Sequence, residues 1–168
     1  MEVVYETNRL CLKVFQQQDL DAAKQFWGDA EVMEHSGGAT PHELLPKVLQ
    51  GYEKCYREKG LSVYAVTDKS FGKVIGAAGF NVNASIDKVE LIYHFSKLSW
   101  GKGFATEAAK ACIDIAKQHH LVKTLNASAD PLNLGSTKIL ENIGFHFIEM
   151  RWFEDTQQNE PYYEYPIR

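Results

Sequence analysis

The sequence has few cysteines, no long apolar run and no visible signal-peptide pattern. Its 168 residues include three cysteines, which lie far apart and form no C-x-x-C pair. Zinc sites and disulfide frameworks need paired cysteines, so we expect no metal, no disulfide and a reducing compartment. No apolar run approaches the ~18 residues that span a bilayer. The first residues lack the basic-then-apolar pattern of a signal peptide. We therefore expect a cytoplasmic protein that does not bind membranes.

An excess of positive charge is also missing. The chain has 18 Lys and Arg against 22 Asp and Glu, a formal net charge of −4. Proteins that neutralise phosphates usually carry a basic excess, so we expect no nucleic-acid partner. The hydrophobic share of 45% and charged share of 24% are typical of a folded domain. The length suits one domain over residues 1–168.

The pattern of apolar residues predicts an α+β fold. Alternating or continuous apolar stretches between turn residues indicate strands, and apolar stripes at helical spacing indicate helices. The expected strands are 9–15, 62–67, 74–81, 88–95, 123–129, 145–153 and 162–167. The expected helices are 19–27, 42–58, 105–117 and 134–143. This order predicts a mostly antiparallel sheet of about seven strands, one β-α-β crossover and helices on both faces.

The stretch Ser99–Lys117 places two glycines immediately before an alanine-rich helix. Glycines let successive N–H groups point into one concavity, and a helix N-terminus adds a positive dipole end. Such a turn can bind a phosphate or diphosphate, but it can also be a turn without a ligand. It is not a P-loop. It supplies the first two glycines of a dinucleotide fingerprint, Gly101 and Gly103, with Thr106 in place of the third and Asp130 as a candidate ribose-binding acid.

Several stretches together resemble the GNAT acetyltransferases, in particular the branch with the ribosomal-protein N-terminal acetyltransferases. "TNRLCLKVF" and "DAEVMEHSGG" are similar to the branch's opening, and "GKVIGAAGF" to its central hairpin strand. More specific are "VELIYHFSKLSWGKGFATEAAKACIDIA", which resembles the acetyl-CoA motif, and "NLGSTKILENIGF" after it. The resemblance covers nearly the whole chain. It implies a central pair of parallel strands that splay apart and acetyl transfer from acetyl-CoA to an amine.

The resemblance also assigns the residues that bind the co-substrate. Main-chain N–H groups of the glycine turn are expected to hold the diphosphate, and the edge of the preceding strand to pair with pantetheine. The helix after the next strand is expected to contact pantetheine and the thioester sulfur. The matching positions are Tyr93, His94, Phe95, Trp100, Gly101, Lys102, Gly103, Phe104, Ala105, Thr106, Asn133 and Ser136.

The chemistry requires a neutral amine and a route for protonating the leaving thiolate. Glu90 matches the catalytic glutamate of some family members and is the first candidate base, although a solvent-facing or salt-bridged glutamate is an equal alternative. His94 is a second candidate because imidazole titrates near neutrality. Many family members carry a tyrosine as general acid where this chain has Leu140. The resemblance implies that Ser136 contacts the sulfur instead, and a water molecule is the alternative.

Three functions remain open on the sequence alone. The first is an acetyl-CoA-dependent N-acetyltransferase that acts on a protein N-terminus or a small-molecule amine by direct attack in a ternary complex. The second is a catalytically weak CoA-binding or regulatory module, which Leu140 keeps open. The third is a nucleotide-binding oxidoreductase. The C-terminal aromatic residues either fill the core, wall the acceptor pocket or support self-association, so the protein is a monomer or a homodimer.

Overall fold

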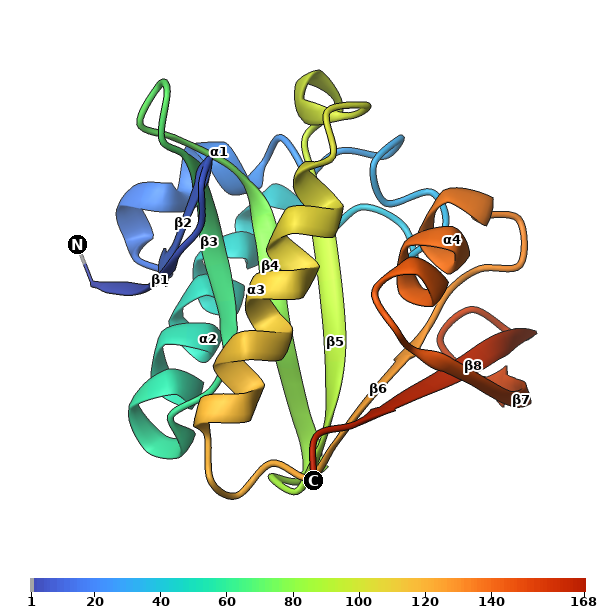
Figure 1. The fold of residues 1–168 in the computed structure, drawn as a ribbon. Helices are drawn as coiled ribbons and strands as arrows, with labels where there is room; N and C mark the ends of the chain where they lie inside the picture. Colours follow the sequence, from blue (N-terminus) through green and yellow to red (C-terminus); the bar gives the residue numbers. More distant parts are fainter. Residues whose placement is uncertain (1) are drawn as a thin grey trace.

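The strands of the protein form one sheet, which the computed structural model describes over residues 2–168. Within these residues, eight strands pair in the order β1-β2-β3-β4-β5-β6-β8-β7 (Figure 1). The strands are β1 (Val3–Glu6), β2 (Leu10–Val14), β3 (Val63–Asp68), β4 (Lys73–Ser85), β5 (Lys88–Phe95), β6 (Thr124–Ser128), β7 (His146–Phe153) and β8 (Gln158–Pro166). The α-helices are α1 (Leu20–Ala23), α2 (Leu45–Lys59), α3 (Phe104–Gln118) and α4 (Leu134–Asn142).

Strand direction follows the connections between the strands. Hairpin turns join β3 to β4 and β4 to β5, and both pairs are antiparallel. The strands β5 and β6 run parallel, so they cannot share a tight turn, and α3 makes the crossover between them. The predicted α+β architecture, with a mostly antiparallel sheet and one crossover, is confirmed.

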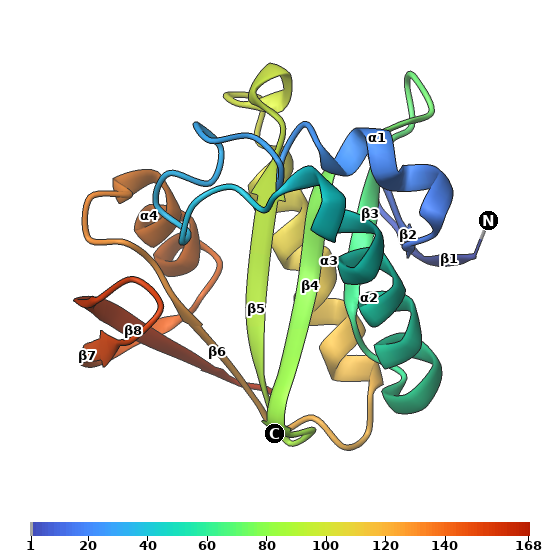
Figure 2. The same cartoon turned by 180° about the vertical axis from the view of Figure 1, so that it is seen from behind.

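Helices cover both faces of the sheet, as expected. Helix α3 lies across the face seen in Figure 1, and α1 and α2 lie on the opposite face in Figure 2. The buried side of α3 is rich in alanine, including Ala108, Ala109 and Ala116, which lets its axis approach the sheet closely. Side chains of β5 alternate between the two cores: Leu91 and Phe95 belong to the core beneath α3, and Ile92 packs with the core beneath α2.

Two elements differ from the sequence-based prediction. The sheet has eight strands because Val3–Glu6 pairs with β2, and a four-residue edge strand gives little periodic signal. The predicted helix 19–27 is wrong beyond its first turns: a 3-10 turn (Gln17–Asp19) and α1 end at Ala23. Phe26 and Trp27 then pack with Phe15 in the second core, so tertiary packing overrides the local helical preference.

Candidate active site

The two parallel strands in the middle of the sheet separate along their length. They pair at three positions, from Lys88↔Thr124 to Glu90↔Asn126. Strand β5 then continues to Phe95, and no strand among residues 2–168 pairs with it on that side. Figures 1 and 2 show the strands diverging from this end. A cleft of about 920 Å³ lies here, lined by both strands, the glycine turn and the start of α4. This is the expected splayed central pair.

The glycine turn forms one end of the cleft. Gly101 and Gly103 have φ angles of 76° and 79°, in the left-handed region that favours glycine. Gly103 is the N-cap of α3 and supplies no side-chain cap. Within residues 2–168, no N–H group of residues 101–106 donates a hydrogen bond to a backbone or side-chain acceptor. Unsatisfied N–H groups at a helix N-terminus fit an anionic diphosphate, so the turn fits the group that the resemblance implies.

A clamp between the first strands and α3 holds this turn in place. Arg9 donates from Nε to Glu107 Oε1 at 2.7 Å and from a terminal nitrogen to the carbonyl oxygen of Lys102 at 2.8 Å. Its guanidinium also lies 4.4 Å from the ring centre of Phe104. Burial opposes ionisation of Glu107, but hydrogen bonds from Thr7 and Arg9 hold its pKa below the usual range. Sequence reasoning missed this clamp because its members are about a hundred residues apart.

The edge of β5 that faces the cleft carries free main-chain groups. The Ser96 N–H donates to the carbonyl oxygen of Ile75 in β4. Main-chain groups alternate in direction along a strand, so those of His94 also face β4, and those of Tyr93 and Phe95 face the gap. The Phe95 carbonyl accepts a hydrogen bond from the indole of Trp100 at 2.9 Å, which ties the glycine turn to the strand. An extended ligand can pair with the groups that remain.

Glu90 lies where the two strands begin to separate. Its Oε1 accepts a hydrogen bond from the Asn81 amide at 3.2 Å, and Asn81 accepts one from the Tyr52 hydroxyl at 3.3 Å. Burial raises the pKa of Glu90, as do the charges of Asp155 and Glu160, while Asn81 opposes the shift. No cation pairs with Glu90 within residues 2–168, so the salt-bridged alternative is wrong. The side chain is half-buried and lines the cleft. A carboxylate with a raised pKa in a cleft suits proton transfer.

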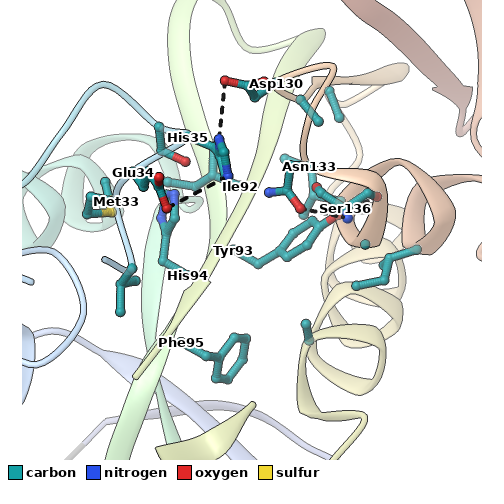
Figure 3. Close-up of a pocket in the computed structure, with 18 of the residues that line it drawn as sticks. Met33, Glu34, His35, Ile92, Tyr93, His94, Phe95, Asp130, Asn133 and Ser136 are labelled. Carbon is teal, nitrogen blue, oxygen red and sulfur yellow. Dashed lines mark hydrogen bonds and ion pairs between the residues drawn. The ribbon is translucent and has the colours of Figure 1, made fainter. Parts of the chain in front are cut away.

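His94 points to the other side of β5 from Tyr93 (Figure 3). Its Nδ1 lies 3.2 Å from the indole Nε1 of Trp27, which donates the hydrogen bond. Burial lowers the pKa of His94 to about 4, so the imidazole is neutral at pH 7. The nitrogen that could accept a proton is therefore engaged, which disfavours His94 as a base.

Tyr93 and α4 bring two hydroxyl groups together across the gap. The Tyr93 hydroxyl lies 3.0 Å from Ser136 Oγ, and the Asn133 side chain caps α4 by accepting the Ser136 N–H at 3.2 Å (Figure 3). Burial raises the pKa of Tyr93 to about 12, so it keeps its proton. Leu140 is 1% exposed and belongs to the core. Sequence reasoning gave Tyr93 only a backbone role and did not foresee this hydroxyl pair.

The other histidines and the C-terminal aromatic residues have simpler surroundings. His42 and His119 contact main-chain oxygens of Gly28 and Lys59. His35 lines the cleft, with Nδ1 3.4 Å from Asp130 Oδ2 (Figure 3). Tyr162 and Tyr163 are buried on β8, whereas Trp152 on β7 is about half exposed.

Negative charge dominates the cleft. Its lining includes the carboxylates of Glu31, Glu34, Glu90, Asp130, Asp155 and Glu160. No Lys or Arg among residues 2–168 lines it. Within residues 2–168 there is no cluster of three or more His, Cys, Asp or Glu side chains that could bind a metal ion. No helix in this range is long and apolar enough to cross a bilayer. The region beside Glu90 thus attracts cations.

Two features together define the acetyltransferase class that the sequence resembles. One is a mostly antiparallel sheet with a splayed parallel pair, and the other is a glycine turn at the start of the crossover helix. The sequence model described as "Acetyltransferase (GNAT) domain" matches residues 9–146, well over half of the chain. The chain belongs to this family of N-acetyltransferases.

Individual relatives agree with this assignment. An uncharacterized N-acetyltransferase, p20, from Bacillus licheniformis is 30% identical over 149 residues, which cover 86% of this chain and 83% of that protein. A GNAT-family acetyltransferase structure from Bacillus anthracis superposes with a TM-score of 0.84 at 20% identity over 99% of both chains. The ribosomal L7/L12 alpha-N-protein acetyltransferase RimL in complex with coenzyme A has a TM-score of 0.83 at 12% identity over 98% of both chains. The last two show the fold alone. The resemblance to the GNAT acetyltransferases is confirmed by the family match.

Proposed function

We propose that this protein transfers an acetyl group from acetyl-CoA to a primary amine by direct attack within a ternary complex. One observation carries the proposal: a single cleft joins the unsatisfied N–H groups of the glycine turn to Glu90. The first is suited to the diphosphate and the second to the amine. Bound acetyl-CoA supplies an activated thioester, and the residues of this chain orient it and move protons.

Binding is assigned to main-chain groups and to α4. The N–H groups from Gly101 to Thr106, with Trp100 bracing the turn, hold the diphosphate. The free edge of β5 between Tyr93 and Phe95 pairs with the pantetheine amides as an added strand would. Asn133 and Ser136 face the same gap from α4. The complex of RimL with coenzyme A supports this use of the fold.

Glu90 is proposed as the base that takes a proton from the attacking amine, directly or through water. An α-amine has an ordinary pKa of about 7.7–8.0, so it needs little assistance, whereas a lysine amine near 10.4 needs more. The raised pKa of Glu90 brings it closer to the pKa of the amine, and that favours proton transfer.

Ser136, with Tyr93 behind it, is proposed to protonate or hydrogen-bond the leaving sulfur. Leu140 has no proton to give, so the role falls to a neighbouring group. The Tyr93 hydroxyl can donate to Ser136 Oγ while Ser136 donates to sulfur. This chain of hydroxyls would perform the role of the tyrosine found in other family members.

The acceptor is proposed to be a protein N-terminus or a small-molecule amine, since the carboxylates of the cleft attract a protonated amine before it is deprotonated. We propose that the domain spans residues 1–168, acts in the cytoplasm and needs neither metal, nucleic acid nor membrane. A CoA-binding module without turnover is the second candidate, favoured by the apolar side chain of Leu140. An oxidoreductase is disfavoured because Thr106 replaces the third glycine of the dinucleotide fingerprint.

Two measurements test the proposal. Thermal unfolding with CoA, NAD or ATP should show stabilisation by CoA, because a ligand that binds the native state raises its stability. Stabilisation by NAD and not by CoA would indicate the oxidoreductase. Thiol release from acetyl-CoA should then depend on an amine, across a panel of polyamines, amino acids and peptides with alanine or serine N-termini. Tight CoA binding without amine-dependent thiol release for any member would leave only the binding module.

A further inference from the structure

The two edges of the sheet are built differently. Strand β1 at one edge has four residues, whereas β7 at the other has eight and contains no proline or lysine. Large apolar side chains of β7 are exposed: Phe147 by 54%, Ile148 by 47%, Met150 by 52% and Trp152 by 53%. Natural proteins usually protect an edge strand of this length with lysine, proline, a bulge or a covering segment. The pairing of β7 with β8 has one irregularity, between Phe147 and Glu149, and is regular from Glu149 to Phe153. An apolar edge without lysine or proline is a template for pairing with another strand.

The main chain of β7 is arranged for such pairing. Met150 lies opposite Pro161 of β8, and proline has no N–H to donate. This pair therefore cannot exchange two hydrogen bonds, and the N–H and C=O groups of Met150 point towards the open edge. By the alternation of a strand, those of Trp152 do the same, while Arg151 faces β8.

The side chains of β7 are complementary to a second, antiparallel copy of the same strand. With Met150 opposite Met150 of the copy, Glu149 falls opposite Arg151 of the copy and Ile148 opposite Trp152. Shifting the axis to Ile148 or Trp152 places Glu149 opposite Phe147 or Asp155. Moving the axis by one residue, to Glu149 or Arg151, places that charged side chain opposite its own copy. An axis between two residues pairs outward-facing backbone groups with inward-facing ones. Only the Met150 register matches both the charges and the main-chain groups.

The charges of this register are already held in position. Arg151 donates to Glu149 Oε2 at 2.7 Å, and its guanidinium lies 3.6 Å from the ring centre of Tyr162. Both side chains thus stay beside the strand, and little side-chain entropy is lost when the copy's charges approach. Opposite charges directly across a strand pair stabilise it, and like charges destabilise it.

We propose that two copies of this chain associate through β7, in antiparallel register about Met150, to form a two-fold symmetric dimer with one continuous sheet. A two-fold interface requires a surface that is complementary to itself, which the order of charged and apolar residues in β7 provides. The proposal does not depend on the acetyl-transfer function.

Cross-linking tests the register directly. The full-length Met150→Cys variant should form a disulfide-linked dimer under mild oxidation, because residue 150 faces its own copy. Phe71→Cys is the matched control, since Phe71 is 76% exposed in the turn between β3 and β4. Sedimentation should show a dimer for the unmodified chain. A monomer at all concentrations up to the millimolar range, or equal cross-linking of both variants, overturns the proposal.

A charge exchange tests the pairing of Glu149 with Arg151. Glu149→Arg should weaken dimerisation by roughly tenfold or more, because each dimer loses two opposite-charge pairs and gains two like-charge pairs. Adding Arg151→Glu should restore it, since opposite charges again face one another. If circular dichroism shows that Glu149→Arg is unfolded, Met150→Lys gives the same test by placing two lysines on the axis. A dimer that either folded variant leaves unweakened contradicts this interface.

Discussion

The indole N–H of Trp27 donates a hydrogen bond to Nδ1 of His94 across 3.2 Å. One partner comes from the loop after α1 and the other from β5, so the contact attaches that loop to the wall of the cleft. The bond requires Nδ1 to be unprotonated, and burial already lowers the pKa of His94 to about 4. Protonating this imidazole therefore breaks a contact that supports the site.

The buried His94 should make the protein sensitive to mild acid. Its pKa is about 6.5 when unfolded and about 4 when folded, so the unfolded state takes up the proton first. The contribution of neutral His94 to the free energy of unfolding is fully present above pH 6.5 and is lost as the pH falls towards 4. Between pH 7.5 and pH 5, urea unfolding should show a loss of about 1–2 kcal/mol from this group. The His94→Gln variant retains an acceptor for the Trp27 indole, so its free energy of unfolding should fall by about 1–2 kcal/mol less over the same pH range. An equal fall in both proteins would show that His94 is not the group responsible.

The second prediction concerns Glu90. Glu90→Gln should lower kcat by roughly a hundredfold or more, the size of a typical general-base contribution, and leave the KM for acetyl-CoA nearly unchanged. The wild-type rate should have an acid limb with a midpoint above the ordinary glutamate pKa, because burial raises the pKa of Glu90. The variant should lack that limb.

Stability measurements distinguish a catalytic Glu90 from a structural one. A buried carboxylate with a raised pKa destabilises the fold when it ionises, so Glu90→Gln should unfold at the same or a higher temperature at pH 8. If Glu90→Gln keeps wild-type turnover, Glu90 has no part in the mechanism.

The third prediction tests the glycine turn. Gly103→Trp should abolish CoA binding in calorimetry, because the added side chain crowds the turn and the Arg9 clamp that holds it: a Cβ at Gly103 would lie 3.5 Å from the Arg9 guanidinium. Gly72→Trp is a matched control: Gly72 also has a positive φ, 66° against 79°, and a Cβ added there would meet no heavy atom within 4 Å. Both variants carry similar backbone strain, of about 1–2 kcal/mol. Equal CoA affinities in the two would remove the turn from the binding site.

The architecture and the glycine turn could be predicted from sequence because their signals are local. Alternation in β5 and the alanine stripe of α3 are each contained in one segment. The hydrogen-bond chain from Tyr52 to Glu90 is different, because it needs the register Asn81↔Glu90 between two strands and the placement of α2 against them. The Arg9–Glu107 clamp likewise depends on tertiary packing. Sequence patterns indicated the candidate site, but the groups that surround it are positioned by contacts between distant segments.

The fourth prediction concerns the hydroxyl pair of Tyr93 and Ser136. Ser136→Ala should lower kcat by roughly tenfold or more, while Tyr93→Phe, which removes only the outer hydroxyl, should have a smaller effect in the same direction. The thiolate of a more acidic thiol leaves without being protonated. With a thioester of such a thiol, both variants should therefore approach the wild-type rate. Unequal rates that persist with that substrate would assign the pair a purely structural role.

The last prediction uses the negative charge near the candidate base. Asp155 and Glu160 both raise the pKa of Glu90, and Asp155 is the more exposed of the two. Asp155→Asn should lower the pKa of Glu90 and move the acid limb of kcat/KM to lower pH, on the order of a few tenths of a unit. It should also raise the KM of acceptors with a second positive charge more than that of singly charged amines, and both effects should shrink with added salt. Glu58→Gln, at the exposed end of α2, removes the same charge far from the cleft and should do neither. An unmoved acid limb in Asp155→Asn would mean that Glu90 does not set the pH dependence, since a charge that acts on Glu90 must act on the rate it controls.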